Sequence, residues 1–175
     1  MTSASSDRIA GGSLALVLVL CAASTAASQG IPPAGPAGKT YTMEVMGLAA
    51  DPASKQPVVI LRAREDRREL SMFIGPFEAQ AIALPLQGQQ LPRPYTHDLI
   101  VAMLRQVNAM LVKVVITDLR DNTYFATLHL RSQGRDIELD SRPSDAIALA
   151  LRLNAPILAD ERVFRSPAPV SGEGR

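Results

Sequence analysis

The sequence has no tryptophan, and aromatic residues make up only 4% of its 175 positions. A folded core must therefore be filled by aliphatic side chains, and the 47% share of hydrophobic residues is large enough for one domain with short tails. An excess of charge is also missing, because 18 lysines and arginines stand against 17 aspartates and glutamates. A dedicated DNA-binding domain is usually strongly basic, so a contact with nucleic acid would depend on a local basic patch.

Cysteine is nearly absent as well. Cys21 is the only one, and it ends the apolar run Leu14–Cys21, which is too short to cross a bilayer but has the length of a signal-peptide core. We expect residues 1–28 to be an export signal that is cleaved before Gln29. Leu20 stands where lipid attachment to Cys21 needs a small residue, which argues against a lipoprotein. The mature chain would then have no thiol and no transmembrane anchor, and would be periplasmic or secreted.

The rest of the chain divides by composition. Residues 29–39 contain three prolines and three glycines and are expected to form a flexible linker. Residues 165–175 are rich in proline, glycine and serine and are expected to form a disordered tail. The folded domain is therefore expected at residues 40–164.

Short runs of alternating or β-branched residues indicate strands, separated by turns such as Arg120-Asp121-Asn122 and Gln133-Gly134. The strands are expected at residues 41–46, 57–61, 70–74, 112–116, 123–130, 136–140 and 156–158. Helices are expected to begin at Pro76, to cover residues 96–110, and to begin again at Pro143. Hairpins dominate this order and the helices stand between them. It therefore predicts a single α+β domain with a mixed or mostly antiparallel sheet and about three helices.

The clearest amphipathic helix is expected over residues 96–110, with Thr96 as its N-cap. Six apolar residues recur there at helical spacing: Leu99, Ile100, Met103, Leu104, Val107 and Leu111. We expect them to form one face that packs on the core.

The run Asp140-Ser141-Arg142-Pro143-Ser144-Asp145 ends a strand and begins the most apolar helix of the chain. Pro143 suits the first helical position because it has no N–H group and a fixed φ. Asp145 in the first turn and Arg152 in the last agree with the helix dipole. The residues between them are almost all apolar, so we expect this helix at the centre of the fold. A buried pair of Arg142 and Asp145 there would stabilise the fold by more than an exposed pair, about 3–5 kcal/mol on loss of one partner.

Three expected helix starts combine a proline with polar groups: Pro76 before Glu78, Arg93-Pro94 before Thr96-His97-Asp98, and Arg142-Pro143 before Ser144-Asp145. Amides at a helix N-terminus and a nearby arginine bind phosphate, so Arg93, Arg142 and Ser144 are candidate phosphate ligands. The alternative is purely structural, because acidic residues cap helices and Arg–Asp pairs join neighbouring turns.

Hydrolytic chemistry would need a base or a metal ion. The sequence has no His-x-x-x-His pair, no nucleophile elbow and no P-loop. Four acidic residues fall at junctions before helices: Glu78, Asp98, Asp140 and Asp145. If two or three of them converge, they could hold Mg²⁺ or Mn²⁺ and activate a water molecule. His97 is a further candidate base, with a structural role as its alternative. Asp140 is favoured as base or metal ligand because it ends a strand and has no capping role.

Three separate motifs of this chain together resemble the bifunctional nuclease domain family: Ile74-Gly75 with Glu78-Ala79, Arg93-Pro94-Tyr95-Thr96-His97-Asp98-Leu99, and Asp140-Ser141-Arg142-Pro143-Ser144-Asp145-Ala146 with Ala155-Pro156-Ile157. The resemblance covers about residues 41–164. Plant members of the family are described as cleaving RNA and DNA, so the resemblance implies a nuclease with nucleic acid as its substrate. The export signal departs from the intracellular bacterial members we would expect, and the extra C-terminal motif of some plant members is lacking.

Two functions remain open at this point. The first is a nuclease whose centre lies where the Asp140–Asp145 turn meets the Arg93–Asp98 turn. The second is an exported module without enzymatic activity, which binds a ligand or assembles as a homo-oligomer. Convergence of the acidic residues and His97 in space would favour the first, and their scatter over separate faces would favour the second.

Overall fold

The computed structural model describes residues 38–89 and 91–164. The expected export signal at 1–28, most of the expected linker at 29–39 and the expected tail at 165–175 lie outside the described residues. The described elements, in chain order, are β1 (Thr40–Ala50), β2 (Pro57–Ala63), β3 (Glu69–Phe73), α1 (Pro76–Leu86), α2 (Thr96–Gln106), β4 (Ala109–Arg120), β5 (Thr123–Ser132), β6 (Arg135–Ser141), α3 (Pro143–Leu153), β7 (Ile157–Asp160) and a short 3₁₀ turn (Glu161–Phe164). No helix in these two ranges is long and apolar enough to cross a membrane.

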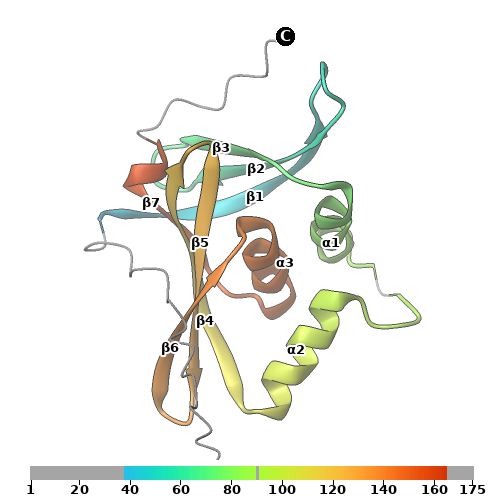
Figure 1. Cartoon of the computed structure of the whole chain (residues 1–175), viewed down its shortest axis with the longest axis vertical. Coiled ribbons are helices and arrows are strands. Elements are labelled where there is room, and N and C mark those ends of the chain that lie inside the picture. Colours follow the sequence, from blue (N-terminus) through green and yellow to red (C-terminus); the bar gives the residue numbers. More distant parts are fainter. Residues whose placement is uncertain (1–37, 90, 165–175) are drawn as a thin grey trace, which may run out of the picture. The chain divides into compact units, whose positions relative to one another are not determined.

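The strands form one seven-stranded sheet in the order β3-β2-β1-β7-β4-β5-β6. All neighbouring strands are antiparallel except β4 and β7, which are parallel. The sheet is strongly twisted, so that β1–β3 run across the top of Figure 1 while β4–β6 run down it. The expected α+β class with a mixed, mostly antiparallel sheet and three α-helices is confirmed.

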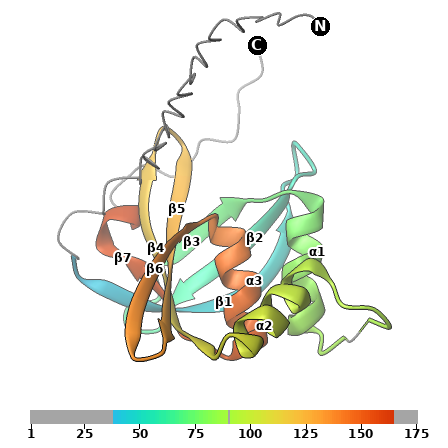
Figure 2. The same cartoon turned by 60° about the horizontal axis from the view of Figure 1, so that its bottom comes forward.

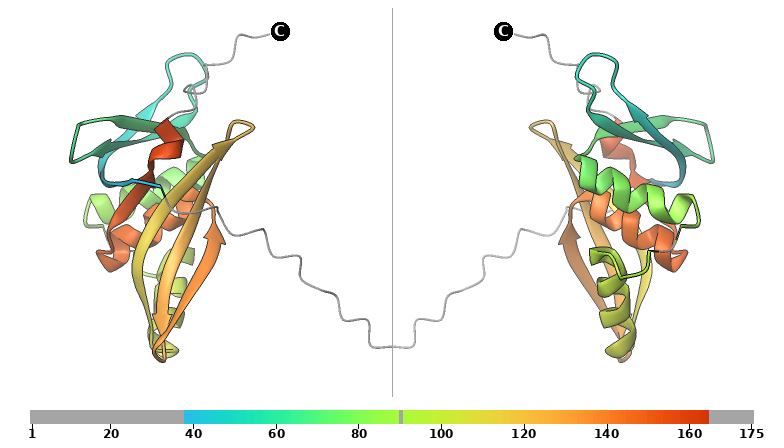
Figure 3. Two further views of the ribbon diagram at one scale, coloured as in Figure 1. Left: turned by 90° about the vertical axis from the view of Figure 1, so that its left-hand side faces the viewer. Right: turned by 90° about the vertical axis from the view of Figure 1, so that its right-hand side faces the viewer.

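The three α-helices lie on one side of the sheet, as the two side views in Figure 3 show. Helix α3 packs against both other helices, α1 and α2, and against β4 and β5 (Figure 2). Five consecutive residues of α3, Ala146–Ala150, are buried in the core. The small alanines allow close approach of the neighbouring elements, so the expected central position of this helix is confirmed.

The expected helix at 96–110 is shorter in the structure. Helix α2 ends at Gln106, because Asn108 takes a left-handed conformation (φ 52°) and β4 begins at Ala109. Asparagine tolerates this backbone region better than most residues, which makes it a natural stop. Tyr95 occupies the N-cap position instead of the expected Thr96, and its N–H donates to the Asp98 carboxylate at 2.8 Å.

The expected core face of this helix is also only partly correct. Ile100 and Leu104 pack against the core. The other helical members of the expected face, Leu99, Met103 and Val107 at the C-cap, are exposed. A second apolar surface of α2 is therefore left uncovered by the described part of the chain.

Candidate functional site

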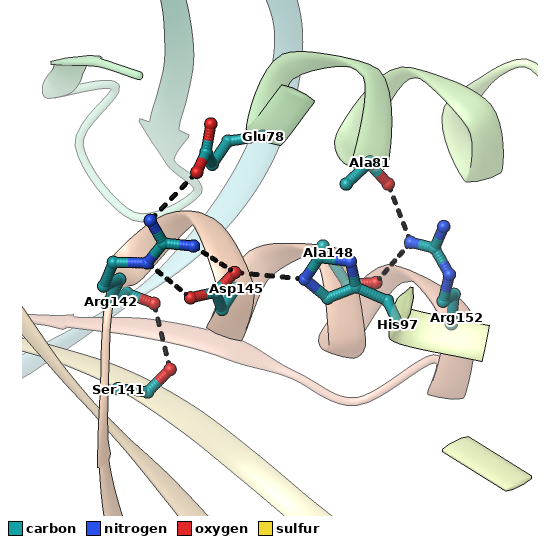
Figure 4. A network of polar contacts seen from close by, with 8 residues as sticks. All are labelled: Glu78, Ala81, His97, Ser141, Arg142, Asp145, Ala148 and Arg152. Carbon is teal, nitrogen blue, oxygen red and sulfur yellow. Dashed lines mark hydrogen bonds and ion pairs between the residues drawn. The ribbon is translucent and has the colours of Figure 1, made fainter. Parts of the chain in front are cut away.

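The site begins at the N-terminus of α3, where the chain leaves β6. Arg142 is the N-cap residue in extended conformation and Pro143 is the first helical residue. The guanidinium of Arg142 turns back over this helix start, where Nε donates to Asp145 Oδ2 (2.7 Å) and Nη2 donates to Asp145 Oδ1 (3.0 Å). Its remaining terminal nitrogen, Nη1, donates to Glu78 Oε1 on α1 at 2.9 Å. One arginine thus joins the first turns of two helices (Figure 4).

A third helix reaches the same group through His97. Its Nε2 lies 3.1 Å from Asp145 Oδ1, across 48 positions of sequence. The histidine is buried, and Nδ1 has no hydrogen-bond partner among the described residues. When Asp145 is ionised, Nε2 must carry the proton of this contact. His97 therefore orients Asp145 from behind and is shielded from a ligand bound at the surface.

In this network, Arg142 and Asp145 each stabilise the charged form of the other. Burial raises the pKa of Asp145, but hydrogen bonds from Arg142 and then from His97 lower it more, and the net pKa lies below its usual value. The hydrogen bond to Asp145 raises the pKa of Arg142 above its usual value. Asp145 is therefore a carboxylate near neutral pH, held by two partners, and acts as an anchor for the guanidinium.

A cleft of about 340 Å³ opens beside Arg142 and Glu78. Its lining comes from the end of β3, the start of α1, the β4–β5 turn and the start of α3: Met72, Phe73, Ile74, Gly75, Glu78, Asn122, Thr123, Tyr124, Arg142, Pro143 and Ser144. The N-termini of two helices therefore meet at one cleft. Their amides and positive dipole ends favour an anion there.

Gly75 has a specific role at this cleft. A side-chain carbon at this position would collide with Glu78 Oε2. The carboxylate of Glu78 therefore lies folded over the glycine, with Oε1 on Arg142. A larger residue at position 75 would force Glu78 out of this orientation.

Arg142 keeps hydrogen-bonding capacity for a ligand. A guanidinium has five N–H donors, and the contacts in the described chain use three of them, which leaves one on each terminal nitrogen. The side chain is 65% exposed, so these donors can reach an anion in the cleft. This exposure makes the expectation of a buried Arg142–Asp145 pair wrong: the pair lies at the surface, with Asp145 as its more buried member.

The buried arginine of this region is Arg152, at the other end of α3. Its side chain is only 8% exposed, and Nε donates to Asp98 Oδ1 at 2.7 Å. Its Nη1 donates to the carbonyl oxygens of Ala81 (2.7 Å) and Ala148 (2.9 Å). Pro85 lies four residues after Ala81 within α1 and has no N–H, so it cannot donate the helical bond to that carbonyl. Arg152 supplies the missing donor.

The sequence candidates therefore separate into two groups. Glu78, His97, Arg142 and Asp145 form the network, and Ser144 is buried beside them in the lining of the cleft. Asp98 instead accepts a hydrogen bond from Arg152. Burial raises the pKa of Asp98, but hydrogen bonds from Arg152 and the Tyr95 amide lower it more.

Asp140 and Arg93 lie elsewhere. Asp140 is exposed on the edge strand β6, opposite Thr127 of β5, and is not part of the cleft lining. Arg93 is exposed in the loop between α1 and α2. The two expected turns do meet, but through His97 and Asp145. No described contact tests the expected roles of Asp140 and Arg93.

A preformed metal site is absent from the described residues, where no group of three or more histidine, cysteine, aspartate or glutamate side chains is placed to hold a metal ion. The two carboxylates nearest the cleft, Glu78 and Asp145, both accept hydrogen bonds from Arg142. The donor set expected for Mg²⁺ or Mn²⁺ is thus not assembled among these residues.

Sequence reasoning missed two contributors to this region. Gly75 was part of a motif, but its role depends on the carboxylate that folds over it. The structural role of Arg152 could have been suspected from Pro85, because a proline inside a helix leaves a carbonyl in need of another donor. Which residue supplies that donor depends on the packing of α1 against α3, which the sequence does not show.

Comparison with known proteins gives one family. Residues 59–170 match the model of the bifunctional nuclease domain. An uncharacterized protein of Mycobacterium tuberculosis is 40% identical over 122 residues, which are 70% of this chain and 73% of that protein. Bifunctional nuclease 1 of Oryza sativa subsp. japonica is 30% identical over 109 residues, which are 59% of this chain but only 33% of the rice protein.

Proposed function

This chain belongs to the bifunctional nuclease domain family, and from that premise we propose that it hydrolyses phosphodiester bonds in RNA or DNA at the cleft beside Arg142. The observation that carries the proposal is the convergence of two helix N-termini on an exposed guanidinium with two N–H donors that no contact in the described chain uses. These groups match the negative charge and the non-bridging oxygens of a phosphodiester.

Arg142 is the phosphate ligand in this proposal. Its two remaining N–H groups bind non-bridging oxygens, and the bidentate contact with Asp145 fixes the plane of the guanidinium. His97 holds Asp145 in place from the interior. Because these groups are already oriented, charge that develops on the phosphate in the transition state is stabilised without a large rearrangement. Asp145 and His97 are therefore positioning residues.

Glu78 is the proposed general base. It lines the cleft, and its Oε1 accepts from Arg142 while Oε2 lies over Gly75. A water molecule between Oε2 and the phosphorus would give its proton to Glu78 as its oxygen bonds to phosphorus. The bond from phosphorus to the leaving oxygen then breaks, and that oxygen takes a proton from solvent. The products are a phosphomonoester and an alcohol.

The test is a cleavage assay on purified protein with labelled RNA, single-stranded DNA and duplex DNA, in Mg²⁺, in Mn²⁺ and in a chelator. We expect cleavage by the wild-type chain and a loss of at least about 100-fold in Glu78→Gln, which keeps the shape and still accepts from Arg142. Asp140→Asn is the discriminating comparison. Loss of cleavage in Asp140→Asn and not in Glu78→Gln would reject Glu78 as the base and return the role to Asp140.

A second function is favoured by one specific observation. Both oxygens of Asp145 and one oxygen of Glu78 already accept hydrogen bonds, which suits a stable phosphate-binding site without hydrolysis. An exported or intracellular module of this kind would bind nucleic acid and release it unchanged. Tight binding of RNA or DNA, with no cleavage under any of the metal conditions, would support this function and reject the nuclease.

The location of the protein is a separate proposal. We propose that it is exported, with cleavage before Gln29, on the basis of the Leu14–Cys21 run. A family match says nothing about this location, so the proposal depends on the N-terminal sequence alone.

A further inference from the structure

A row of apolar side chains on α2 has no partner in the described chain. Leu99, Met103 and Val107 follow one another at intervals of four residues, and their exposed fractions are 55%, 52% and 59%. Residues at this spacing form a single ridge along a helix, and such ridges make the commonest helix-to-helix contacts. The adjoining face of α2 already packs on the core through Ile100 and Leu104. The row is therefore an additional apolar surface that residues 38–89 and 91–164 do not bury.

The edge strand β6 extends this surface. Ile137 and Leu139 are exposed large apolar residues, and they pair with Leu130 and Leu128 of β5. Directly paired residues point to the same face of a sheet, and Leu128 and Leu130 belong to the core on the helical side. Figure 3 shows α2 on this helical side of the sheet, whose edge strand is β6. One end of the row meets the β5–β6 hairpin, where the Ser132 hydroxyl at the end of β5 donates to the Val107 carbonyl at 3.3 Å.

We propose that this surface, made of Leu99, Met103, Val107, Ile137 and Leu139, is the interface of a homodimer whose two-fold axis passes beside Met103. In a two-fold pair of antiparallel α2 helices, Met103 contacts Met103 of the second copy and Leu99 contacts Val107. The row is symmetric about its centre, so it is complementary to itself and needs no second kind of surface. It also carries no charged residue that would be buried unpaired.

The surface has the size of the apolar centre of a dimer interface. Five side chains at these exposures present on the order of several hundred Å² of apolar area, which is the range of functional patches. A stable dimer removes about 800 Å² per partner from water. The surrounding residues of α2 and β6 would supply the remainder as the polar rim that such interfaces have.

Pairing through the open edge of β6 is the competing arrangement for two copies, and the charges of the strand oppose it. A two-fold register centred on Glu138 places that residue opposite itself and Asp136 opposite Asp140. A register centred on Ile137 opposes Asp136 to Glu138, and one centred on Leu139 opposes Glu138 to Asp140. Like charges directly opposite each other destabilise a strand pair. The dimer therefore forms through the helical face.

The experiment measures the mass of the full chain in solution by sedimentation equilibrium up to about 100 µM. We expect a dimer for the wild type and an increase of at least about 100-fold in its dissociation constant for Met103→Glu, because the two-fold axis places two carboxylates together. Met46→Glu is the matched control, since Met46 is 47% exposed on β1 and lies outside the surface. It should dimerise as the wild type does.

A cysteine variant tests directly whether the two-fold axis passes beside Met103. In a chain that also carries Cys21→Ser, Met103→Cys should form a disulfide-linked dimer under mild oxidation, whereas Met46→Cys should not. A wild-type chain that stays monomeric over the whole concentration range would overturn the proposal. A monomer that binds lipid vesicles through α2 would overturn it in the same way. A dimer that persists unchanged in Met103→Glu would overturn it as well. None of these results depends on nuclease activity.

Discussion

The two arginines at the ends of α3 should differ sharply in their contribution to stability, and this difference gives the most detailed prediction. Arg142 is 65% exposed and its partners are near solvent, so Arg142→Ala should lower the free energy of unfolding by less than about 1 kcal/mol. Arg152 is 8% exposed and donates to two carbonyl oxygens and to Asp98. Its removal leaves an acceptor without a donor in the interior.

The expected cost follows from these contacts. Removal of one partner of a buried ion pair costs about 3–5 kcal/mol when the other charge stays buried. Asp98 is partly exposed and can be hydrated again, which places Arg152→Ala near the lower end, at about 3 kcal/mol. About 1–3 kcal/mol of this is the penalty for the Ala81 carbonyl, because Pro85 cannot donate to it.

A double-mutant cycle of Arg152→Ala with Pro85→Ala measures the penalty for the Ala81 carbonyl separately. Alanine at position 85 restores an N–H to α1, which can donate to the Ala81 carbonyl in place of Arg152. Arg152→Ala should therefore cost about 1–2 kcal/mol less in the Pro85→Ala background than in the wild type. The assay is urea unfolding followed by circular dichroism. Equal costs in the two backgrounds, or equal costs for Arg142→Ala and Arg152→Ala in the wild type, would refute the reasoning.

Three further predictions test other parts of the molecule. Burial raises the pKa of Asp145, but hydrogen bonds from Arg142 and His97 lower it more, so the pKa in the folded state lies below the usual value of 3.8. The ionised Asp145 therefore stabilises the folded state above pH 3.8, and this stabilisation is lost as the pH falls through the lower folded pKa. The free energy of unfolding should therefore fall less in Asp145→Asn than in the wild type between about pH 6 and about pH 2, and an equal fall would contradict the assignment. Gly75→Ala should displace Glu78 and reduce any cleavage by about tenfold or more with little change in melting temperature, whereas unchanged cleavage would show that Glu78 need not lie over Gly75. Mass spectrometry of the exported protein should find an N-terminus near Gln29, and an intact chain in the cytosol would reject export.

Local signals explain why so much of the fold could be predicted. The β4–β5 turn at Asp121-Asn122 takes left-handed φ values of 48° and 60°, which asparagine and aspartate favour in tight hairpins. Pro143 begins α3 at the first helical position, as its missing N–H and fixed φ predict. These features depend on residues adjacent in sequence, so the element order and the sheet class followed from the sequence.

The parts that could not be predicted depend on contacts between distant segments. Amphipathicity shows that a helix has an apolar side, but it does not show which apolar residues a neighbour covers, and this is why the exposure of Met103 was unexpected. In the same way, the sequence favours Asp140 over Asp145 as base or metal ligand, because Asp140 ends a strand and Asp145 stands in the first turn of a helix. Only the three-dimensional position of His97 and Glu78 places Asp145 in the network and leaves Asp140 on an exposed strand edge.

The most direct test of the central claim compares nucleic-acid cleavage by Arg142→Gln and Arg64→Gln. The two arginines have nearly equal exposure, 65% and 63%, and each forms a surface ion pair, but only Arg142 lines the cleft. Each variant loses one positive charge, so the general attraction of nucleic acid falls equally in both. The account predicts a loss of at least about 100-fold in cleavage rate for Arg142→Gln and a change of less than about threefold for Arg64→Gln. Equal rates for the two variants would contradict the placement of the reaction at this cleft.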